Sequence, residues 1–196
     1  MIDIPIITER LTIRRFEHSD IDGYLEFMLD DESTRFLAFD AEQKTEVGAR
    51  ALFEYVIGSY DSPEAIHAYC ISDSQTASYL GSCGFAPYEE GVVECYYCVN
   101  PGQRGSGIAA EATKELIAAL SPNFEIRAFC HPDNRAAHAV AERSGMTHVG
   151  LSRNKNTGLE GEVFVFPKKH TKLSVPPGPS SLILQSFRQI LFKLFV

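Results

Sequence analysis

The chain has 196 residues, of which 44% are hydrophobic, and its 26 acidic and 18 basic side chains give a formal net charge of −8. This length suits one domain, and the abundance of Leu, Ile, Val and Phe excludes an intrinsically disordered or collagen-like chain. An acidic chain without a long basic run lacks the clustered Lys and Arg that hold a phosphate backbone. We therefore expect no nucleic-acid partner.

The N-terminus and the cysteines favour a cytoplasmic protein. Residues 1–5 carry Asp3 where a signal peptide has basic residues and then a long apolar stretch. No apolar run approaches the roughly 20 residues of a transmembrane helix. The five cysteines all fall in strand-like segments, which indicates reduced, buried thiols. Cys95 and Cys98 have CxxC spacing but should point to opposite faces of a strand, so we expect no redox or metal site.

The first part of the chain predicts one strand and two helices. Residues 8–16 alternate, with Leu11 and Ile13 on one face, as in a half-buried strand. Residues 18–20 offer a helix N-cap, and apolar side chains at helical spacing extend this helix to about Asp30. A second helix is expected over residues 45–60, because turn-forming residues follow it.

The middle and end of the domain predict a sheet with further helices. Residues 66–72, 78–86 and 92–99 look like strands of an antiparallel meander, because short polar joints separate them. A helix to about Leu120, a strand over 124–130 and a helix over 134–144 with Gly145 as its C-cap follow. Strands at 147–152 and 162–166 suggest a closing hairpin. This order predicts an α/β (α+β) fold with a single mixed, largely antiparallel sheet of about seven strands and about four helices.

Residues 1–169 account for this domain, and the tail is expected to be separate. Prolines make residues 170–180 a stiff, extended linker. Residues 181–196 place large apolar side chains on one helical face, as in an amphipathic helix. Because large exposed apolar patches are rare, this helix should dock on the domain, a second subunit or another partner. Shallow membrane association is the alternative.

Two glycines at residues 104–109 mark the segment with the clearest chemistry. Glycine lets the backbone turn tightly and approach a ligand, and the first N–H groups of the following helix suit a phosphate. A helix entry without a ligand is the alternative. A P-loop is excluded because Ile108 stands where it needs Lys. Residues 105–110 match a dinucleotide-binding GxGxxA, but one strand–helix unit after antiparallel strands does not suit that fold.

Three segments in the correct order resemble the GNAT acetyltransferase superfamily. Residues 104–109 resemble its (Gln/Arg)-x-x-Gly-x-(Gly/Ala) loop, which cradles the pyrophosphate of coenzyme A. Residues 8–14 look like the opening strand of the branch of ribosomal-protein-alanine N-acetyltransferases, and residues 134–146 are similar to a later motif of that branch. Ala137 stands where the branch usually has Ser, and Met146 replaces an aromatic residue.

The resemblance implies that acetyl-CoA lies in a cleft where the strand that ends near Val99 separates from the strand at 124–130. The Val99 N–H would polarise the thioester carbonyl, and Glu94 is the candidate general base, acting through a water; its alternative is a solvated strand acid. Tyr97 and His131 are further candidates for the base. The cofactor-binding residues implied are Cys98, Val99, Arg104, Gly105, Ser106, Gly107, Ile108, Ala109 and Asn134.

The function expected from this resemblance is acetyl transfer from acetyl-CoA to a primary amine by direct attack in a ternary complex. The acceptor would be a protein N-terminus or a small-molecule amine, and no metal is implied. A non-catalytic acyl-CoA-binding or interaction domain of the same fold is the alternative. The motifs do not identify the acceptor, because acceptor pockets are built from variable loops and helices.

Overall fold

The computed structural model describes residues 2–62 and 65–169. The expected linker at 170–180 and the expected amphipathic helix at 181–196 lie outside the described residues. The docking and membrane interactions predicted for that helix therefore stay predictions. Within the described residues, no helix is long and apolar enough to cross a membrane.

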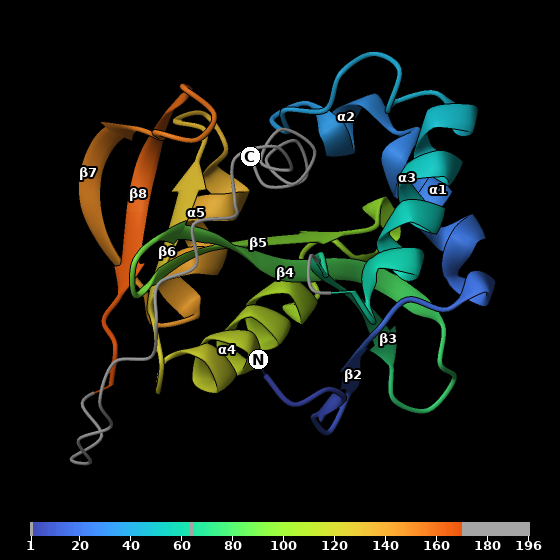
Figure 1. Ribbon diagram of the computed structural model, residues 1–196, viewed down its shortest axis with the longest axis horizontal. Helices are drawn as coiled ribbons and strands as arrows, with labels where there is room; N and C mark the ends of the chain where they lie inside the picture. Colours follow the sequence, from blue (N-terminus) through green and yellow to red (C-terminus); the bar gives the residue numbers. More distant parts are fainter. Residues whose placement is uncertain (1, 63–64, 170–196) are drawn as a thin grey trace.

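One mixed sheet organises the described residues (Figure 1). Its strand order is β1-β2-β3-β4-β5-β6-β8-β7, and the pair β5–β6 is parallel while the other pairs are antiparallel. The strands are β1 (Ile6–Ile7), β2 (Leu11–Arg14), β3 (His67–Asp73), β4 (Tyr79–Glu89), β5 (Val92–Val99), β6 (Glu125–Cys130), β7 (Thr147–Arg153) and β8 (Glu160–Phe166).

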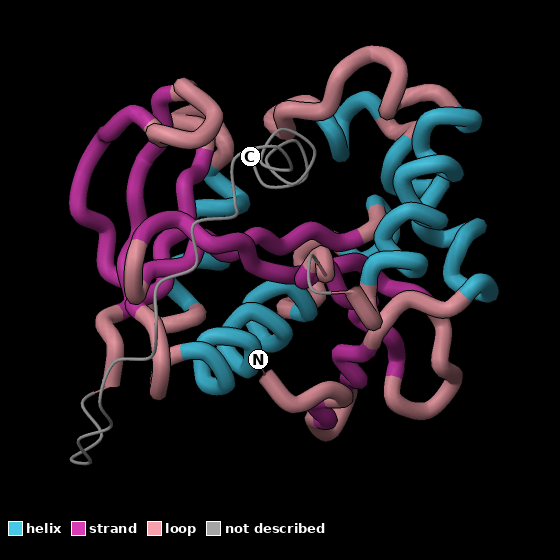
Figure 2. Tube along the Cα trace, in the orientation of Figure 1, coloured by secondary structure: helices cyan, strands magenta, loops and turns pink. Residues whose placement is uncertain are grey.

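Helices lie on both faces of the sheet (Figure 2). Each face of the sheet has its own hydrophobic core cluster. Helices α1 and α3 pack on one face, and α4 and α5 pack on the other. Each strand alternates between the clusters because successive side chains point to opposite faces. The helices are α1 (Ile21–Met28), α2 (Asp31–Thr34), α3 (Glu46–Ser59), α4 (Ile108–Leu120) and α5 (Arg135–Arg143), with short 3-10 turns at His18–Asp20 and Pro101–Gln103.

The predicted fold class, the central meander and the closing hairpin are confirmed. Gly145 ends α5 as expected, with φ +88° and its N–H donating to the Glu142 carbonyl. The differences concern short elements. The strand β1 has two residues and the helix α2 has four. Elements this short show no hydrophobic periodicity, so the sequence did not predict them. The N-cap of α2 is Asp30, whose carboxylate accepts from the Ser33 N–H.

Asp20 is the N-cap residue of α1, as residues 18–20 suggested, but its side chain makes no capping hydrogen bond to that helix. Its side chain is 3% exposed and makes two hydrogen bonds with the Arg14 guanidinium, at 2.7 and 2.9 Å. It also accepts from the Glu17 N–H. The carboxylate raises the pKa of Arg14 through these hydrogen bonds. This pair ties the end of β2 to the start of α1.

Candidate functional site

The parallel strands β5 and β6 separate after three paired residues. Val92, Val93 and Glu94 pair with residues 125–127, whereas residues 95–99 of β5 have no partner in β6. On its other edge, β6 pairs with β8 over residues 126–130. Figure 1 shows β6, β8 and β7 rising steeply away from β4 and β5. The sheet therefore opens beside the C-terminal half of β5, where the family resemblance implies the cleft.

The main chain at the end of β5 faces this opening. The Asn100 N–H donates to the carbonyl of Leu80, in the adjacent strand β4, at 2.9 Å. Backbone N–H groups alternate in direction along an antiparallel strand, so the Val99 N–H points away from β4, toward the side from which β6 has departed. β5 lies so close to β4 that a Cβ at Gly81 would collide with the Cys98 carbonyl. The position of the Val99 amide is thus set by the strand pairing.

The glycine loop follows β5 and leads directly into α4. Gly105 and Gly107 have φ angles of +77° and +84°, a backbone region that side chains with a Cβ rarely adopt. Gly107 is the N-cap of α4, and its carbonyl accepts the first helical hydrogen bond from the Glu111 N–H. The N–H groups of Gly107 and the next three residues have no acceptor within the helix. Together with the helix dipole, they form an anion-binding position.

Two arginines border this loop. Arg104 directs Nη2 to Asp30 at 3.1 Å and to the Ser33 hydroxyl at 2.7 Å, so a phosphate would share this guanidinium with α2. Arg10 pairs with Glu111 in the first turn of α4, and its Nη1 lies 3.4 Å from the Ser106 carbonyl oxygen. Its guanidinium is 3.8 Å from the position of a Cβ on Gly107. Arg10 is therefore a second cation at the loop.

Asn134 and Tyr97 both contact Ala137, in the first turn of α5. Asn134 is the N-cap of α5 and its Oδ1 accepts from the Ala137 N–H, so its Nδ2 is not used in the cap. The Tyr97 hydroxyl donates to the Ala137 carbonyl at 2.9 Å and lies 3.5 Å from the Cys130 thiol. Tyr97 thus links β5 to β6 and α5 beyond the last residue that pairs the two strands.

Glu94 is buried, in contrast to the solvated strand acid of the alternative reading. Its side chain is 1% exposed, and its Oε1 accepts from Asn154 Nδ2 at 2.8 Å. Its Oε2 is buried and has no hydrogen-bond partner. Burial raises the pKa of Glu94 to about 7, against the smaller lowering effect of the Asn154 hydrogen bond. The carboxyl therefore changes its protonation state near neutral pH.

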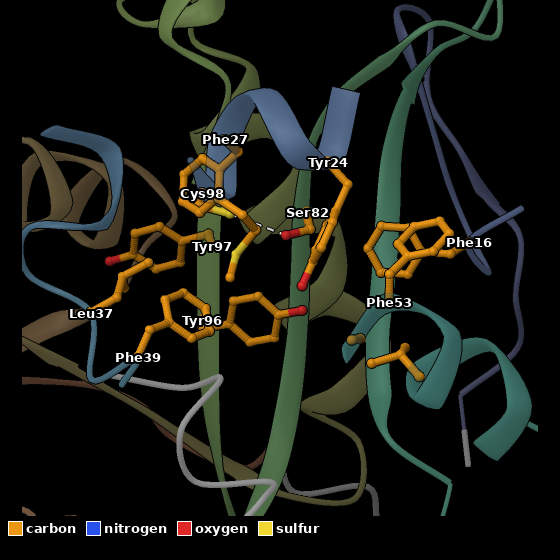
Figure 3. Close-up of a pocket in the computed structure, with 13 residues that line it drawn as sticks. Phe16, Tyr24, Phe27, Leu37, Phe39, Phe53, Ser82, Tyr96, Tyr97 and Cys98 are labelled. Atoms are coloured by element: carbon orange, nitrogen blue, oxygen red, sulfur yellow. Dashed lines mark hydrogen bonds between the residues drawn. The ribbon is translucent and has the colours of Figure 1, made fainter. Parts of the chain in front are cut away.

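A largely apolar cavity lies between α1, α3 and the face of β4 and β5 (Figure 3). Cys98 forms part of its wall, and the Cys98 thiol lies 3.1 Å from the Ser82 hydroxyl. Burial raises the pKa of Cys98 to about 11, so the thiol is protonated at neutral pH. A second, more open cavity lies between Phe36, the end of β6 and the β7–β8 loop. Its rim includes His131, whose ring lies 4.8 Å from that of Phe36.

Comparison with known proteins decides the family. Residues 10–147 match the family profile described as acetyltransferase (GNAT) domain. The chain belongs to the GNAT acetyltransferase family. It is 27% identical over 169 residues to a Bacillus licheniformis protein named uncharacterized N-acetyltransferase p20, covering 82% of this chain and 93% of the relative.

Solved structures share the GNAT fold. A GNAT-family acetyltransferase from Bacillus anthracis has a TM-score of 0.70 and 22% identity, over 84% of this chain and 99% of that one. Ribosomal-protein-S5-alanine acetyltransferase from Vibrio fischeri has a TM-score of 0.64 and 12% identity, over 85% and 97%. The resemblance stated from the sequence motifs is therefore confirmed, and the chain is an acetyl-CoA-dependent N-acetyltransferase.

The geometry of this GNAT domain fits acetyl-CoA as the acetyl donor. A left-handed glycine loop at the N-terminus of a 13-residue helix suits the pyrophosphate, and Arg10 and Arg104 add positive charge beside it. Within residues 2–62 and 65–169, no group of three or more His, Cys, Asp or Glu is placed to hold a metal ion.

Three residues near this candidate site were not expected from the sequence. Arg10 belongs to the motif at residues 8–14, but its distance to the loop depends on the fold. Asn154 lies sixty positions after its partner Glu94. Tyr24 was expected only as one apolar position of a helix, yet it lines the cavity and its buried hydroxyl has no partner. No local pattern signals such contacts, since each joins segments that are far apart in sequence.

Proposed function

We propose that this protein transfers the acetyl group of acetyl-CoA to a primary amine, on a protein N-terminus or a small molecule, by direct attack in a ternary complex. The observation that carries the proposal is the end of β5. There the Val99 N–H points into the opening of the sheet, and the glycine loop begins a few residues later. One segment thus presents a donor for the thioester oxygen and a cradle for the pyrophosphate.

The residues proposed to bind acetyl-CoA follow the chain from β5 to α5. The Cys98 and Val99 main chain would hold the acetyl and pantetheine parts. Backbone N–H groups from Gly105 to Ala109 would receive the pyrophosphate, together with Arg104, and Asn134 Nδ2 would contact the pantetheine arm. Acetyl-CoA supplies the activated acetyl group. The chain's own part is to orient it and to stabilise, with the Val99 N–H, the negative charge that develops on the carbonyl oxygen.

Direct attack by the amine is favoured because no cysteine at the site is activated. Burial raises the pKa of Cys98 and of Cys130 to about 11, and for Cys130 the hydrogen bond shared with Tyr97 opposes this only in part. The thiolate is the nucleophilic form of cysteine, and neither site stabilises it. A covalent acetyl-cysteine therefore has no support, and acceptor and acetyl-CoA would have to be bound together.

Glu94 is proposed as the general base. A group with a pKa of about 7 combines a populated basic form with adequate proton affinity at neutral pH. Because the carboxyl is buried, the proton would reach it through a water. An α-amine, with an ordinary pKa near 7.7–8.0, needs less help from such a base than a lysine near 10.4. This comparison favours an N-terminal amine. The Vibrio fischeri structure is named as a ribosomal-protein-S5-alanine acetyltransferase.

The proposal is tested in two steps. Calorimetric titration of the protein with acetyl-CoA should show binding, and absence of binding at millimolar ligand would contradict the cofactor assignment. Release of the CoA thiol is then followed with a panel of amines and N-terminal peptides. Acetyl-CoA binding without acceptor-dependent thiol release would instead support the non-catalytic alternative.

A further inference from the structure

The second cavity, between Phe36, the end of β6 and the β7–β8 loop, is large enough for a substrate. Its volume is about 520 Å³, within the range of about 300–1,000 Å³ that small-molecule sites occupy. The cavity in Figure 3 has about 30 Å³, which is room for water but not for an acceptor. Figure 1 shows α2 and the turn between β7 and β8 facing one another on the same side of β5. An acceptor is therefore expected between these two segments.

The second cavity adjoins the proposed reaction centre. Cys130 belongs to its wall, and the Cys130 thiol lies 3.5 Å from the hydroxyl of Tyr97, which precedes Val99 by two positions. Asn154 also lines the cavity and donates to the carboxyl of Glu94 at 2.8 Å. The other carboxyl oxygen of Glu94 has no hydrogen-bond partner and is available to a water. An acceptor in this cavity would thus approach the opening of the sheet beside the proposed base.

The wall that the β7–β8 loop contributes is held at two points. One is the hydrogen bond between Asn154 and Glu94. The other is Lys155, whose Nζ lies 2.8 Å from the Glu89 carboxylate and 4.4 Å from the centre of the Tyr88 ring. Both points tie the loop to β4 and β5. This side of the cavity is therefore formed before a ligand arrives, which lowers the entropic cost of binding.

Apolar side chains from three separate segments line the second cavity. Phe36 follows α2, Phe129 belongs to β6, and Leu159 comes from the β7–β8 loop. Phe36 and Phe129 are half-buried, and Leu159 is 47% exposed. A ligand side chain placed against them would remove apolar surface from water on both partners. The cavity therefore favours an acceptor with a large apolar group.

Charge on this lining is acidic or already paired. The acidic members are Asp133 and Glu160. Arg153 lies 3.7 Å from the Glu160 carboxylate and also donates to a loop carbonyl. Among the described residues that line the cavity, no other Arg or Lys is present. A carboxylate on the acceptor would thus meet net negative charge without a free cation, whereas the neutral amide of a peptide would not.

His131 adds a hydrogen-bond donor to the lining. Its Nδ1 accepts from the Asp133 N–H at 3.1 Å, so the neutral ring carries its proton on Nε2. The ring lies 4.8 Å from that of Phe36. A peptide carbonyl is a partner for this donor, and a simple alkylamine offers none. The donor therefore favours a peptide over a free amine.

We propose that the second cavity takes the start of a peptide acceptor whose first side chain is large, apolar and uncharged, such as Met, Leu or Phe. This side chain would lie against Phe36, Phe129 and Leu159, and the first peptide carbonyl would accept from His131. The proposal rests on the proposed acetyl transfer and names its substrate class. The C–N bond forms as the C–S bond breaks, the amine proton passes through a water to Glu94, and the departing CoA thiolate takes a proton from solvent.

The first test compares peptide amides that differ only in their first residue. Peptides that begin with Met, Leu or Phe should be acetylated with a kcat/KM at least tenfold above those that begin with Gly or Glu. Equal values, a preference for Gly or Glu, or acetylation of free amines alone would overturn the acceptor class and leave the proposed function in place. Acetyl-CoA binding is measured beside it by calorimetry. If acetyl-CoA does not bind, the proposed function itself fails.

The second test adds a carboxylate to the cavity. Leu159→Asp should lower the preference for the Leu peptide over the Gly peptide at least fivefold, while acetyl-CoA affinity stays the same. The matched control is Leu151→Asp, on β7 of the same hairpin, because Leu151 is 57% exposed and does not line the cavity. The control should keep the wild-type preference. If both variants keep it, or both lose it equally, the first side chain does not bind against Leu159 and the proposal is wrong.

The third test isolates the donor on His131. His131→Phe should raise the KM for the Leu peptide several-fold, with the same acetyl-CoA affinity. Phenethylamine, measured as a substrate or as a competitor of the peptide, has no carbonyl and should bind both proteins equally. A general disturbance of the cavity would weaken the peptide and phenethylamine alike. That result, or an unchanged KM for the peptide, would remove His131 from the proposal.

Discussion

Asn154 donates a hydrogen bond of 2.8 Å from Nδ2 to Oε1 of Glu94, and both side chains are 1% exposed. Asn154 also organises the β7–β8 loop, since its Oδ1 accepts from the N–H groups of Asn156 and Thr157. One amide thus joins the proposed base on β5 to a loop that borders the second cavity. The conformation of that loop and the environment of Glu94 are consequently coupled.

Glu94→Gln should change how stability and activity depend on pH. Because the folded protein holds the Glu94 proton up to about pH 7 and the unfolded chain releases it near 4.5, wild-type stability falls as pH rises between these values. The loss is on the order of 3 kcal/mol. Glu94→Gln should gain stability relative to wild type over this range in urea unfolding. Its kcat/KM should fall and lose the rise near pH 7.

The control for this substitution is Glu90→Gln, in the exposed turn between β4 and β5. It should have the same pH dependence of unfolding and of kcat/KM as the wild type. If Glu94→Gln also follows the wild-type curves, the carboxyl is ionised like a surface acid and does not act as the base.

Gly107→Glu should abolish acetyl-CoA binding. The substitution places a negative charge at the N-terminus of α4, where the pyrophosphate is proposed to lie, and it strains a backbone with φ +84°. Gly107→Asn separates these effects, because Asn tolerates left-handed conformations and is neutral. Calorimetry should show no binding for the Glu variant and reduced binding for the Asn variant. Wild-type affinity in the Glu variant would mean that the loop does not bind the cofactor.

Arg10→Gln should weaken acetyl-CoA binding several-fold with little effect on stability. Its pair with Glu111 is exposed, and such pairs contribute no more than about 1 kcal/mol. Its charge at the glycine loop, however, would contact or neutralise a phosphate. Arg50→Gln removes a similar exposed pair, with Glu46 on α3, far from the loop in sequence. Equal acetyl-CoA affinities for the two variants would exclude Arg10 from the cofactor site.

Much of the fold followed from local patterns. Alternating residues located the strands, as at Leu11 and Ile13, because one face of each strand enters a core cluster. Gly107 and Gly145 were assigned to helix ends because glycine is favoured there, and their φ angles of +84° and +88° agree with this assignment. The strand β1 and the helix α2 were missed because they are too short for a period. The separation of β5 from β6 was expected from the family resemblance and could not be derived from either strand alone.

The chemistry of the site depends more on long-range contacts. Glu94 looks like any acid on a strand until Asn154 and the surrounding core exclude water from it. Arg104 was expected at the pyrophosphate, and the structure adds a competing partner, Asp30, from another element. A sequence records which groups exist, whereas the pKa of a carboxyl and the direction of a guanidinium depend on what the fold packs against them.

The kinetic mechanism can be tested without substitutions. If the amine attacks acetyl-CoA directly, initial rates at varied acceptor and acetyl-CoA concentrations should give intersecting reciprocal plots. Protein incubated with acetyl-CoA alone should acquire no acetyl adduct in its mass spectrum, because Cys98 and Cys130 are held as thiols. Parallel plots with an acetyl group on either cysteine would establish a covalent intermediate instead.

Asp20→Ala should destabilise the fold by about 3–5 kcal/mol, because it leaves the largely buried Arg14 guanidinium without its carboxylate. Asp61→Ala is the control. It removes an ion pair with the same 2.7 Å separation, to Arg15, but Asp61 is 91% exposed and the expected loss is below about 1 kcal/mol. Urea unfolding at neutral pH measures both. Similar losses for the two variants would show that burial does not decide the contribution of the Arg14 pair, and that the link between β2 and α1 depends on other contacts.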